Sequence, residues 1–242
     1  MNDLPRRDFI QRAAVAAGAV VAVAAELRPD HAYAQAAPAA RRTPMTYELK
    51  KLPFDPSRIK GMSEKLLVSH YENNYTGAVK RLNAIEAQLA GADFATAPVF
   101  VVNGLKREEL IAANSMILHE LYFDGLGGDG PPTGALADAI ARDFGTVERW
   151  KTEFSAMGKA EGGGSGWVLL SWSPRDKRLM NCWAADHTTT LAGGRPILAL
   201  DMYEHAYAMD YGAKAAAYVD AFMQAIRWNN VAGLYDRYSQ QA

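Results

Sequence analysis

The sequence predicts an α+β fold, with an N-terminal antiparallel helical hairpin followed by a C-terminal domain that has a three-stranded antiparallel sheet packed by helices. Two long stretches in the first half carry apolar residues at helical spacing. In the second half, short runs rich in Trp, Val and Leu follow a glycine cluster at residues 162–166, which is typical of strands. A glycine- and proline-rich run at 125–132 separates the two patterns and predicts the domain junction.

Residues 1–34 have the features of a twin-arginine signal peptide. Arg6 and Arg7 precede an uncharged run at 13–25, and an Ala-x-Ala cleavage site follows at 32–34. The uncharged run is shorter than the ~20 apolar residues that cross a bilayer. We therefore expect export by the twin-arginine machinery, which carries folded proteins, to the periplasm or beyond, with no membrane attachment after cleavage. An uncleaved N-terminal anchor is the alternative.

The expected mature chain begins with a disordered leader, residues 35–46, which is rich in Ala, Pro and Arg. Residues 47–56 are predicted to form an extended arm, because Pro53 and Pro56 disfavour a helix.

Two helices complete the predicted N-terminal helical-hairpin domain, residues 47–128. The first is expected from about residue 63 to Gly91, because apolar residues recur there at spacings of four and three. The second is expected over 107–122, and a loop joins the two into an antiparallel pair.

The C-terminal α/β domain, residues 129–242, mixes helical and strand patterns. Two short helices, a β-hairpin, a third strand and a closing helix are predicted in this order: 134–143, 146–157, 167–172 with 179–183, 197–201, and 213–228.

Composition excludes several functional classes. The formal net charge of −1 gives no indication of nucleic-acid binding. A single cysteine, Cys182, allows no intramolecular disulfide, although an exported protein could form one. No second apolar run is long enough to span a membrane.

The run from Asp201 to Tyr207 suggests metal chemistry, because Asp201 and His205 lie four residues apart where a strand gives way to a helix and can point at one spot. His70 and His119 lie on the expected inner faces of the hairpin, where helical bundles place metal ligands. Alone, each histidine is more often a hydrogen-bonded core residue. Together, three imidazoles and one carboxylate predict a site for iron, manganese or zinc.

Other chemistries fit the sequence less well. His119-Glu120 begins like the zinc-protease pattern His-Glu-x-x-His, but its last position is Phe123. No Glu has a His three residues later, as a di-iron bundle requires, and no Gly-x-Ser-x-Gly run marks a nucleophilic serine.

From about residue 47 to residue 235 the chain resembles the iron/manganese superoxide dismutase family. The motifs that carry the resemblance are Tyr47-Glu-Leu-x-x-Leu-Pro53, Gly164-Ser-Gly-Trp167, Asp201-x-x-Glu-His-Ala-Tyr207 and Arg227-Trp-Asn229. The resemblance implies the same order of helical hairpin and three-stranded sheet. It also implies that superoxide is the substrate and is converted to dioxygen and hydrogen peroxide.

The resemblance further implies one iron or manganese ion per chain, held by His70, His119, Asp201 and His205. This ligand set is shared by both metals, so the sequence does not distinguish them.

Four other residues are implied to take part in catalysis. His187 would hold the solvent molecule at the metal, a task for which some family branches use histidine. Trp167 and Tyr203 would wall the pocket. Asn74 stands where the family commonly has a histidine, one turn after the first ligand.

Two further positions depart from the family pattern. Ala78 replaces a tyrosine that gates the substrate funnel, and Ser115 replaces a glutamine that iron enzymes often carry. Such neighbours set ligand basicity and redox potential. A rival hypothesis is therefore a homologue that keeps the metal but has little dismutase activity, in a structural or metal-holding role. A redox enzyme acting on another small substrate is a third possibility.

A homodimer is also implied. In the family, the glutamate that matches Glu204 reaches a ligating histidine of the other subunit, here His205 of a twofold mate. Glu204 is expected to be buried between aromatic residues and to need such a partner. Ala208, where the family commonly has a tyrosine, weakens the expected contact, and dimer and tetramer both stay open.

Overall fold

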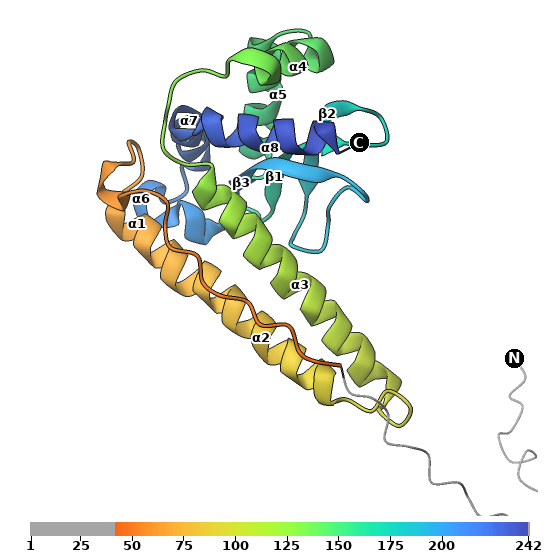
Figure 1. Ribbon diagram of the computed structural model, residues 1–242. Coiled ribbons are helices and arrows are strands. Elements are labelled where there is room, and N and C mark those ends of the chain that lie inside the picture. Colours follow the sequence, from red (N-terminus) through yellow and green to blue (C-terminus); the bar gives the residue numbers. More distant parts are fainter. Residues whose placement is uncertain (1–41, 242) are drawn as a thin grey trace, which may run out of the picture. The chain divides into compact units, whose positions relative to one another are not determined.

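The front half of the fold is a long helical hairpin, as predicted (Figure 1). In the computed structural model, which describes residues 42–241, its first arm consists of α1 (Glu64–Ser69), a π-helical segment (His70–Tyr75) and α2 (Thr76–Gly91). The second arm is α3 (Val99–Asp124), which packs along α2. The expected signal peptide and most of the leader lie outside the described residues.

The prediction that the second helix begins near residue 107 was wrong, because α3 begins at Val99. Residues 99–102 read Val-Phe-Val-Val, and β-branched and aromatic residues have low intrinsic helix propensity. Pro98 precedes them at the N-cap, and its carbonyl accepts from the N–H of Val101 at 2.9 Å and from that of Val102 at 3.2 Å. The main-chain hydrogen bonds of this first turn, rather than packing of its largely exposed side chains, extend the helix to Val99.

A π-helical segment interrupts the first arm, which the sequence predicts as a single regular helix. The backbone N–H of Thr76 donates to the carbonyl of Tyr71, five residues earlier, instead of the usual four. π-bulges are frequent at functional sites because they turn a side chain out of the regular helical path. Here the segment begins at His70, one of the candidate ligands.

The extended arm is confirmed except at its last residue, because Pro56 begins a 3₁₀ turn (Pro56–Arg58). Residues 42–55 form no regular secondary structure and are attached to the hairpin by hydrogen bonds. Tyr47 exchanges two main-chain bonds with the Asn83 amide, and the backbone N–H of Lys50 donates to the Tyr75 hydroxyl at 3.0 Å. The described part of the expected leader, residues 42–46, also contacts α2, because Arg42 pairs with Glu86 at 2.7 Å.

The rear half is built on the expected three-stranded antiparallel sheet, in the order β2-β1-β3. Its strands are β1 (Trp167–Ser173), β2 (Arg178–Ala184) and β3 (Arg195–Asp201). Every residue of the central strand β1 is buried. The register places Trp167 opposite Ala184 on one side and opposite Asp201 on the other. The end of the sheet that carries Trp167 and Asp201 faces the helical hairpin, since β3 contacts α3.

The entry to β1 depends on a glycine. Gly166 has a φ of +149°, and a Cβ there would lie 2.5 Å from the carbonyl oxygen of Ala184. Its own carbonyl accepts a 3.0 Å hydrogen bond from the N–H of Met202. Because only glycine fits so close to another backbone, this position fixes how Trp167 and Asp201 enter the site.

Helices surround the sheet (Figure 1). After the junction come α4 (Gly134–Phe144) and α5 (Val147–Ala160), close to their predicted bounds. The chain then leaves β3 through a 3₁₀ turn (Glu204–Ala206) and the short α6 (Ala208–Tyr211), and ends in α7 (Ala215–Ala225) and α8 (Trp228–Gln240).

The prediction of one closing helix over 213–228 was wrong, because the helix is interrupted at residues 226–227 and a second helix, α8, follows. The N–H of Arg227 donates to the carbonyl of Gly125 at 2.7 Å, and the carboxylate of Asp129 accepts from the N–H of Trp228 at 2.6 Å. The glycine-rich junction therefore caps α8 from a distant part of the sequence. The division into domains at residue 128 stays a prediction.

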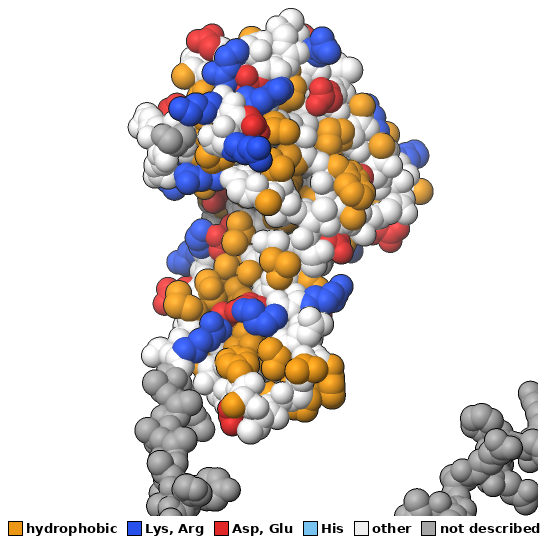
Figure 2. All heavy atoms as spheres, turned by 90° about the vertical axis from the view of Figure 1, so that its right-hand side faces the viewer, with side chains coloured by type: hydrophobic (Ala, Val, Ile, Leu, Met, Phe, Trp, Pro, Cys, Tyr) orange, Lys and Arg blue, Asp and Glu red, His pale blue; other side chains and the backbone are white. Residues whose placement is uncertain are grey.

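Within residues 42–241, no helix combines the length and the apolar character needed to cross a bilayer. Apolar side chains are nevertheless exposed at the outer end of the hairpin, where Figure 2 shows a cluster of them. They include Phe94, Val99 and Phe100, whose exposed fractions are 54%, 84% and 75%.

Candidate metal centre

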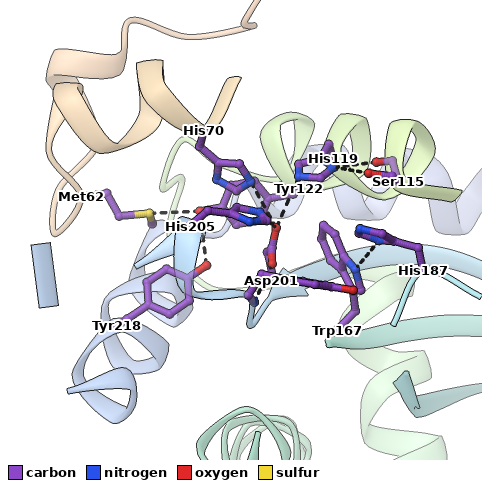
Figure 3. Close-up of polar contacts among 11 residues, drawn as sticks. Met62, His70, Ser115, His119, Tyr122, Trp167, His187, Asp201, His205 and Tyr218 are labelled. Carbon is purple, nitrogen blue, oxygen red and sulfur yellow. Dashed lines mark hydrogen bonds and ion pairs between the residues drawn. The ribbon is translucent and has the colours of Figure 1, made fainter. Parts of the chain in front are cut away.

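The structure brings together the four residues that the sequence singles out as metal ligands (Figure 3). His70 comes from the π-helical segment, His119 from α3, Asp201 from the end of β3 and His205 from the 3₁₀ turn. One potential ligand atom from each residue lies within 4.8 Å of those of the others. His70, His119 and Asp201 are buried, and His205 is partly exposed.

The imidazoles converge on one carboxylate oxygen. The Nε2 atoms of His70 and His205 both lie 3.1 Å from Asp201 Oδ2, and Nε2 of His119 lies 3.6 Å from it. Nε2 of His70 and of His119 nevertheless have no aligned hydrogen-bond partner among the described residues, although both are buried. Buried polar atoms without partners are rare and require an explanation. A cation placed among these donors would satisfy them together, so the residues present fit a metal ion.

Local structure fixes the orientation of two of the ligands. Asp201 is the last residue of β3, and its Oδ1 accepts a 2.9 Å hydrogen bond from the N–H of Tyr203. Nδ1 of His119 lies 2.6 Å from the carbonyl oxygen of Ser115, one turn earlier in α3. A carbonyl only accepts, so Nδ1 of His119 carries the proton and Nε2 presents its lone pair to the site.

The site favours the protonation states that metal binding needs. Burial lowers the pKa of His70, and it lowers the pKa of His119 to about 3, so both imidazoles are neutral near pH 7. Burial alone would raise the pKa of Asp201, but His205 and His70 beside it hold that pKa well below its usual range. Neutral imidazoles with an ionised carboxylate form a competent ligand set.

Aromatic residues close the inner side of the site. Tyr122 is fully buried, and its ring centroid lies 5.0 Å from that of His70. The Tyr218 hydroxyl donates to the Tyr122 hydroxyl at 3.3 Å, and the Tyr122 hydroxyl in turn donates to Met62 Sδ at 3.4 Å. These residues separate the cluster from bulk water on that side, which strengthens electrostatic interactions within it.

The candidate catalytic residues Trp167, His187 and Tyr203 form one group beside the ligands. Trp167 Nε1 donates to His187 Nδ1 at 3.0 Å. The rings of His187 and Tyr203 stack with centroids 4.9 Å apart, and Tyr203 stacks on His205 at 5.4 Å. His187 is therefore adjacent to the cluster, with its ring centroid 6.1 Å from that of His119.

The proton position on His187 follows from these contacts. The indole N–H is a donor only, so His187 Nδ1 must accept and Nε2 carries the hydrogen in the neutral ring. Burial lowers the pKa of His187, and the charge of Asp201 opposes this effect only in part. The lowered pKa favours the neutral imidazole near pH 7. The chain thus presents an N–H donor beside the four ligands.

Asn74 does not join this group. It lies in the π-helical segment and is partly buried, and within residues 42–241 no hydrogen bond links it to a ligand. Ala78 is buried in α2, and Ser115 contributes mainly its carbonyl, since its hydroxyl is 3.4 Å from His119 Nδ1. Asn74 and Ala78, which follow His70 on the same arm, thus offer no side-chain hydrogen bond to the candidate ligands.

The expectation that Glu204 is buried was wrong for the single chain. Glu204 begins the 3₁₀ turn and is exposed, because the turn directs its side chain away from the core that holds Asp201 and Ala206. Within residues 42–241 the Glu204 carboxylate makes no hydrogen bond or ion pair, although the Glu204 carbonyl accepts from the N–H of Tyr207 at 3.1 Å.

Two further polar residues near the site carried no signal in the sequence. Asn114 of α3 donates from Nδ2 to the carbonyl of His187 at 2.6 Å, across 73 residues of sequence. Glu161 is 8% exposed, and its two carboxylate oxygens lack hydrogen-bond partners among the described residues. Burial, together with the charge of Asp201, raises the pKa of Glu161 to about 7. Neither the hydrogen bond of Asn114 nor the burial of Glu161 can be predicted from the sequence without knowing which loops meet.

Comparison with known proteins identifies the fold. Residues 132–234 match the family model described as iron/manganese superoxide dismutases, C-terminal domain. The chain is 71% identical over 188 residues to an iron superoxide dismutase of Cupriavidus metallidurans, covering 78% of this chain and 95% of the relative. The chain belongs to the iron/manganese superoxide dismutase family.

Relatives named for each metal match the chain over similar lengths. A manganese superoxide dismutase of Halobacterium salinarum is 36% identical over 194 residues, which cover 78% of this chain and 95% of the relative. An iron superoxide dismutase of Aquifex pyrophilus is 35% identical over 184 residues, which cover 73% of this chain and 85% of the relative. The α+β fold expected for a member of the iron/manganese superoxide dismutase family is confirmed.

Proposed function

We propose that this protein is a superoxide dismutase, an oxidoreductase that converts two superoxide ions and two protons to dioxygen and hydrogen peroxide. One iron or manganese ion per chain would be held by Nε2 of each of the three histidines and by the carboxylate of Asp201. The convergence of four such donor atoms within 4.8 Å, in a chain 71% identical to an iron superoxide dismutase, supports this function.

When bound, the ion supplies a redox couple that accepts an electron from one superoxide and donates an electron to a second. The residues of the chain set the conditions for this exchange. Asp201 contributes the single negative charge of the ligand set against the cation, so the site keeps a net positive charge that favours a small anion. Trp167 and Tyr122 are fully buried and exclude water from the inner wall.

Superoxide would enter on the side where the site is least covered. His205 has 26% of its side chain exposed, and Tyr203 and His187 are partly exposed beside it. His187 is partly exposed on this side, and its Nε2–H would serve as the donor to a small oxygen anion. Formation of peroxide requires protons, and we propose that His187 helps to hold and pass one of them.

A direct test compares activity with metal content in one preparation. Protein purified from its native host is analysed for iron and manganese, and superoxide decay is followed by stopped flow on the same sample. We expect a decay rate that rises in proportion to the occupied fraction and disappears on metal removal. Full occupancy with negligible activity would instead support the metal-holding homologue, for which Asn74 and Ala78 are the sequence arguments.

We also propose that two chains form an isologous dimer in which Glu204 pairs with the partner subunit's His205. The exposed carboxylate of Glu204, adjacent in sequence to a partly exposed ligand, supports this arrangement. Each subunit would then stabilise the imidazole of the other by a charge-assisted hydrogen bond.

Glu204→Ala is accordingly expected to weaken the dimer by roughly tenfold or more, because the change leaves a buried interface group without its partner. Light scattering across a dilution series measures the dissociation constant of the dimer. Metal analysis of the same fractions shows whether His205 still supports metal binding. Glu148→Ala, at an exposed glutamate of α5, serves as the control and should leave both unchanged. An E204A protein that stays dimeric at the same dilution would rule out this contact.

We further propose that residues 1–34 direct the protein through the twin-arginine pathway to the periplasm. The paired Arg6 and Arg7, the uncharged run and the Ala-x-Ala site support this proposal. Changing both arginines to lysine should leave the full-length precursor in the cytoplasm. Arg12→Lys, within the same signal peptide, should still yield a periplasmic product. Its mass should match a chain that begins at Gln35. Unimpaired export of the double-lysine variant would exclude the pathway.

A further inference from the structure

The segment that carries His187 has little regular structure of its own. It connects β2 to β3 and consists of turns, residues 185–194. Asp186 organises its first turn, because its Oδ1 accepts from the N–H of Thr188 at 2.7 Å and from the Thr188 hydroxyl at 2.6 Å. These bonds shape the turn, but they do not attach it to the rest of the protein.

Side chains from elsewhere in the fold attach this turn. Trp167 of β1 donates to the ring of His187 at 3.0 Å, and the ring of Tyr203 stacks on it at an interplanar angle of 14°. Asn114 instead holds the main chain, since its Nδ2 donates to the His187 carbonyl at 2.6 Å. Contacts to the His187 ring alone do not fix its position, because the ring moves with the main chain of the turn if that main chain is free.

Asn114 also links His187 to a specific ligand. It lies on α3, five residues before His119, and the next residue, Ser115, provides the carbonyl that orients the His119 ring. A single helix therefore carries one metal ligand, the acceptor that orients it and the amide that fixes the neighbouring donor. Because a helix is rigid over two turns, the spacing of His119 and His187 depends on this amide.

We propose that Asn114 is a positioning residue for the reaction, whose amide fixes the His187 imidazole relative to the metal site. This inference rests on the proposed role of His187 as the donor to the small oxygen anion. Asn114 itself touches neither the ligand atoms nor the substrate. Without its hydrogen bond, the turn would relax outward and the Nε2–H of His187 would lose its alignment.

Asn114→Ala and Asn114→Leu test this inference, since leucine keeps the side-chain volume and removes only the amide. Both variants should retain stoichiometric metal. The rate of superoxide decay should fall by roughly tenfold, and the midpoint potential of the bound ion should move in the same direction as in His187→Ala. Asn83→Ala is the matched control, because the Asn83 amide makes the same kind of bond, to the Tyr47 carbonyl at 2.9 Å, away from the site.

A double-mutant cycle separates positioning from a general loss of structure. If Asn114 acts through His187, the Asn114→Leu/His187→Ala double variant should match His187→Ala in rate and potential. Additive effects of the two changes, or an unchanged potential in Asn114→Leu, would overturn the inference while leaving the proposed function intact. An unchanged potential and rate in His187→Ala alone would instead remove the proposed role of His187, and the positioning inference with it.

Discussion

Asp201→Ala is expected to abolish stoichiometric metal binding and, with it, superoxide dismutation. The carboxylate provides the only negative charge of the four-residue cluster, and its Oδ2 lies within 3.6 Å of all three Nε2 atoms. Three neutral imidazoles alone neither balance the charge of the cation nor complete its coordination. Because loss of a residue that only supports a ligand typically costs about 10–100-fold in affinity, loss of this ligand should cost more than about 100-fold.

Elemental analysis and stopped-flow decay of superoxide measure both effects. Asp220→Ala is a suitable control, because Asp220 is exposed on α7 and, within residues 42–241, forms an ion pair with Lys159 alone. Circular dichroism of the D201A protein checks that the fold is retained. An Asp201→Ala protein that still carries one ion per chain would place the metal elsewhere.

His187→Ala should have the second-largest effect, with the metal retained and the activity reduced by roughly 10–100-fold. His187 does not belong to the four-donor cluster, so its loss leaves the ligands in place. It does remove the Nε2–H donor that the hydrogen bond from Trp167 orients, and the midpoint potential should shift for that reason. Potentiometry, metal analysis and superoxide decay on one preparation give the three readings.

His187→Gln provides the matched comparison, because glutamine can accept from the Trp167 indole and still present an N–H. It should recover part of the activity that alanine loses. Recovery of metal-free protein from His187→Ala would mean that this residue is misassigned and contributes to metal binding itself.

The sequence predicts the order of elements well wherever strong local signals exist. The glycine cluster before Trp167 and the apolar run that ends at Asp201 locate strands whose register then places these two residues opposite each other. Residue type and spacing single out the four candidate ligands, and the resemblance to the family implies the same set. Their convergence, however, is a tertiary property, because it needs the hairpin, the end of β3 and the 3₁₀ turn to meet at one point.

What the sequence does not predict depends on contacts between distant segments. The helix break at Arg227 exists because the junction near Gly125 and Asp129 supplies the hydrogen-bond partners. The π-helical segment at His70 adds one residue to a turn without a glycine or proline to mark it. The hydrogen bond from Asn114 to the His187 carbonyl joins α3 to a turn 73 residues later, and no periodic sequence pattern predicts such a contact.

These distant contacts form the surroundings of the candidate site, whose ligands would come from His70, His119, Asp201 and His205. Asn74, Ala78 and Ser115 place no strong hydrogen-bonding side chain next to the ligands. The Trp167–His187–Asn114 chain of contacts provides the donor that those positions lack. We therefore expect the activity of this protein to be more sensitive to changes in the turn between β2 and β3 than to changes at Asn74, Ala78 or Ser115.

The function proposed for this protein requires that three imidazoles and one carboxylate from four separate segments bind a single ion. Anomalous diffraction at the iron and manganese absorption edges, on crystals of protein purified with its native metal, tests it most directly. We expect one peak per chain, roughly 2 Å from Nε2 of His70, His119 and His205 and from an Asp201 carboxylate oxygen. A peak at any other location, or an ion that His70 or His119 does not reach, would contradict it.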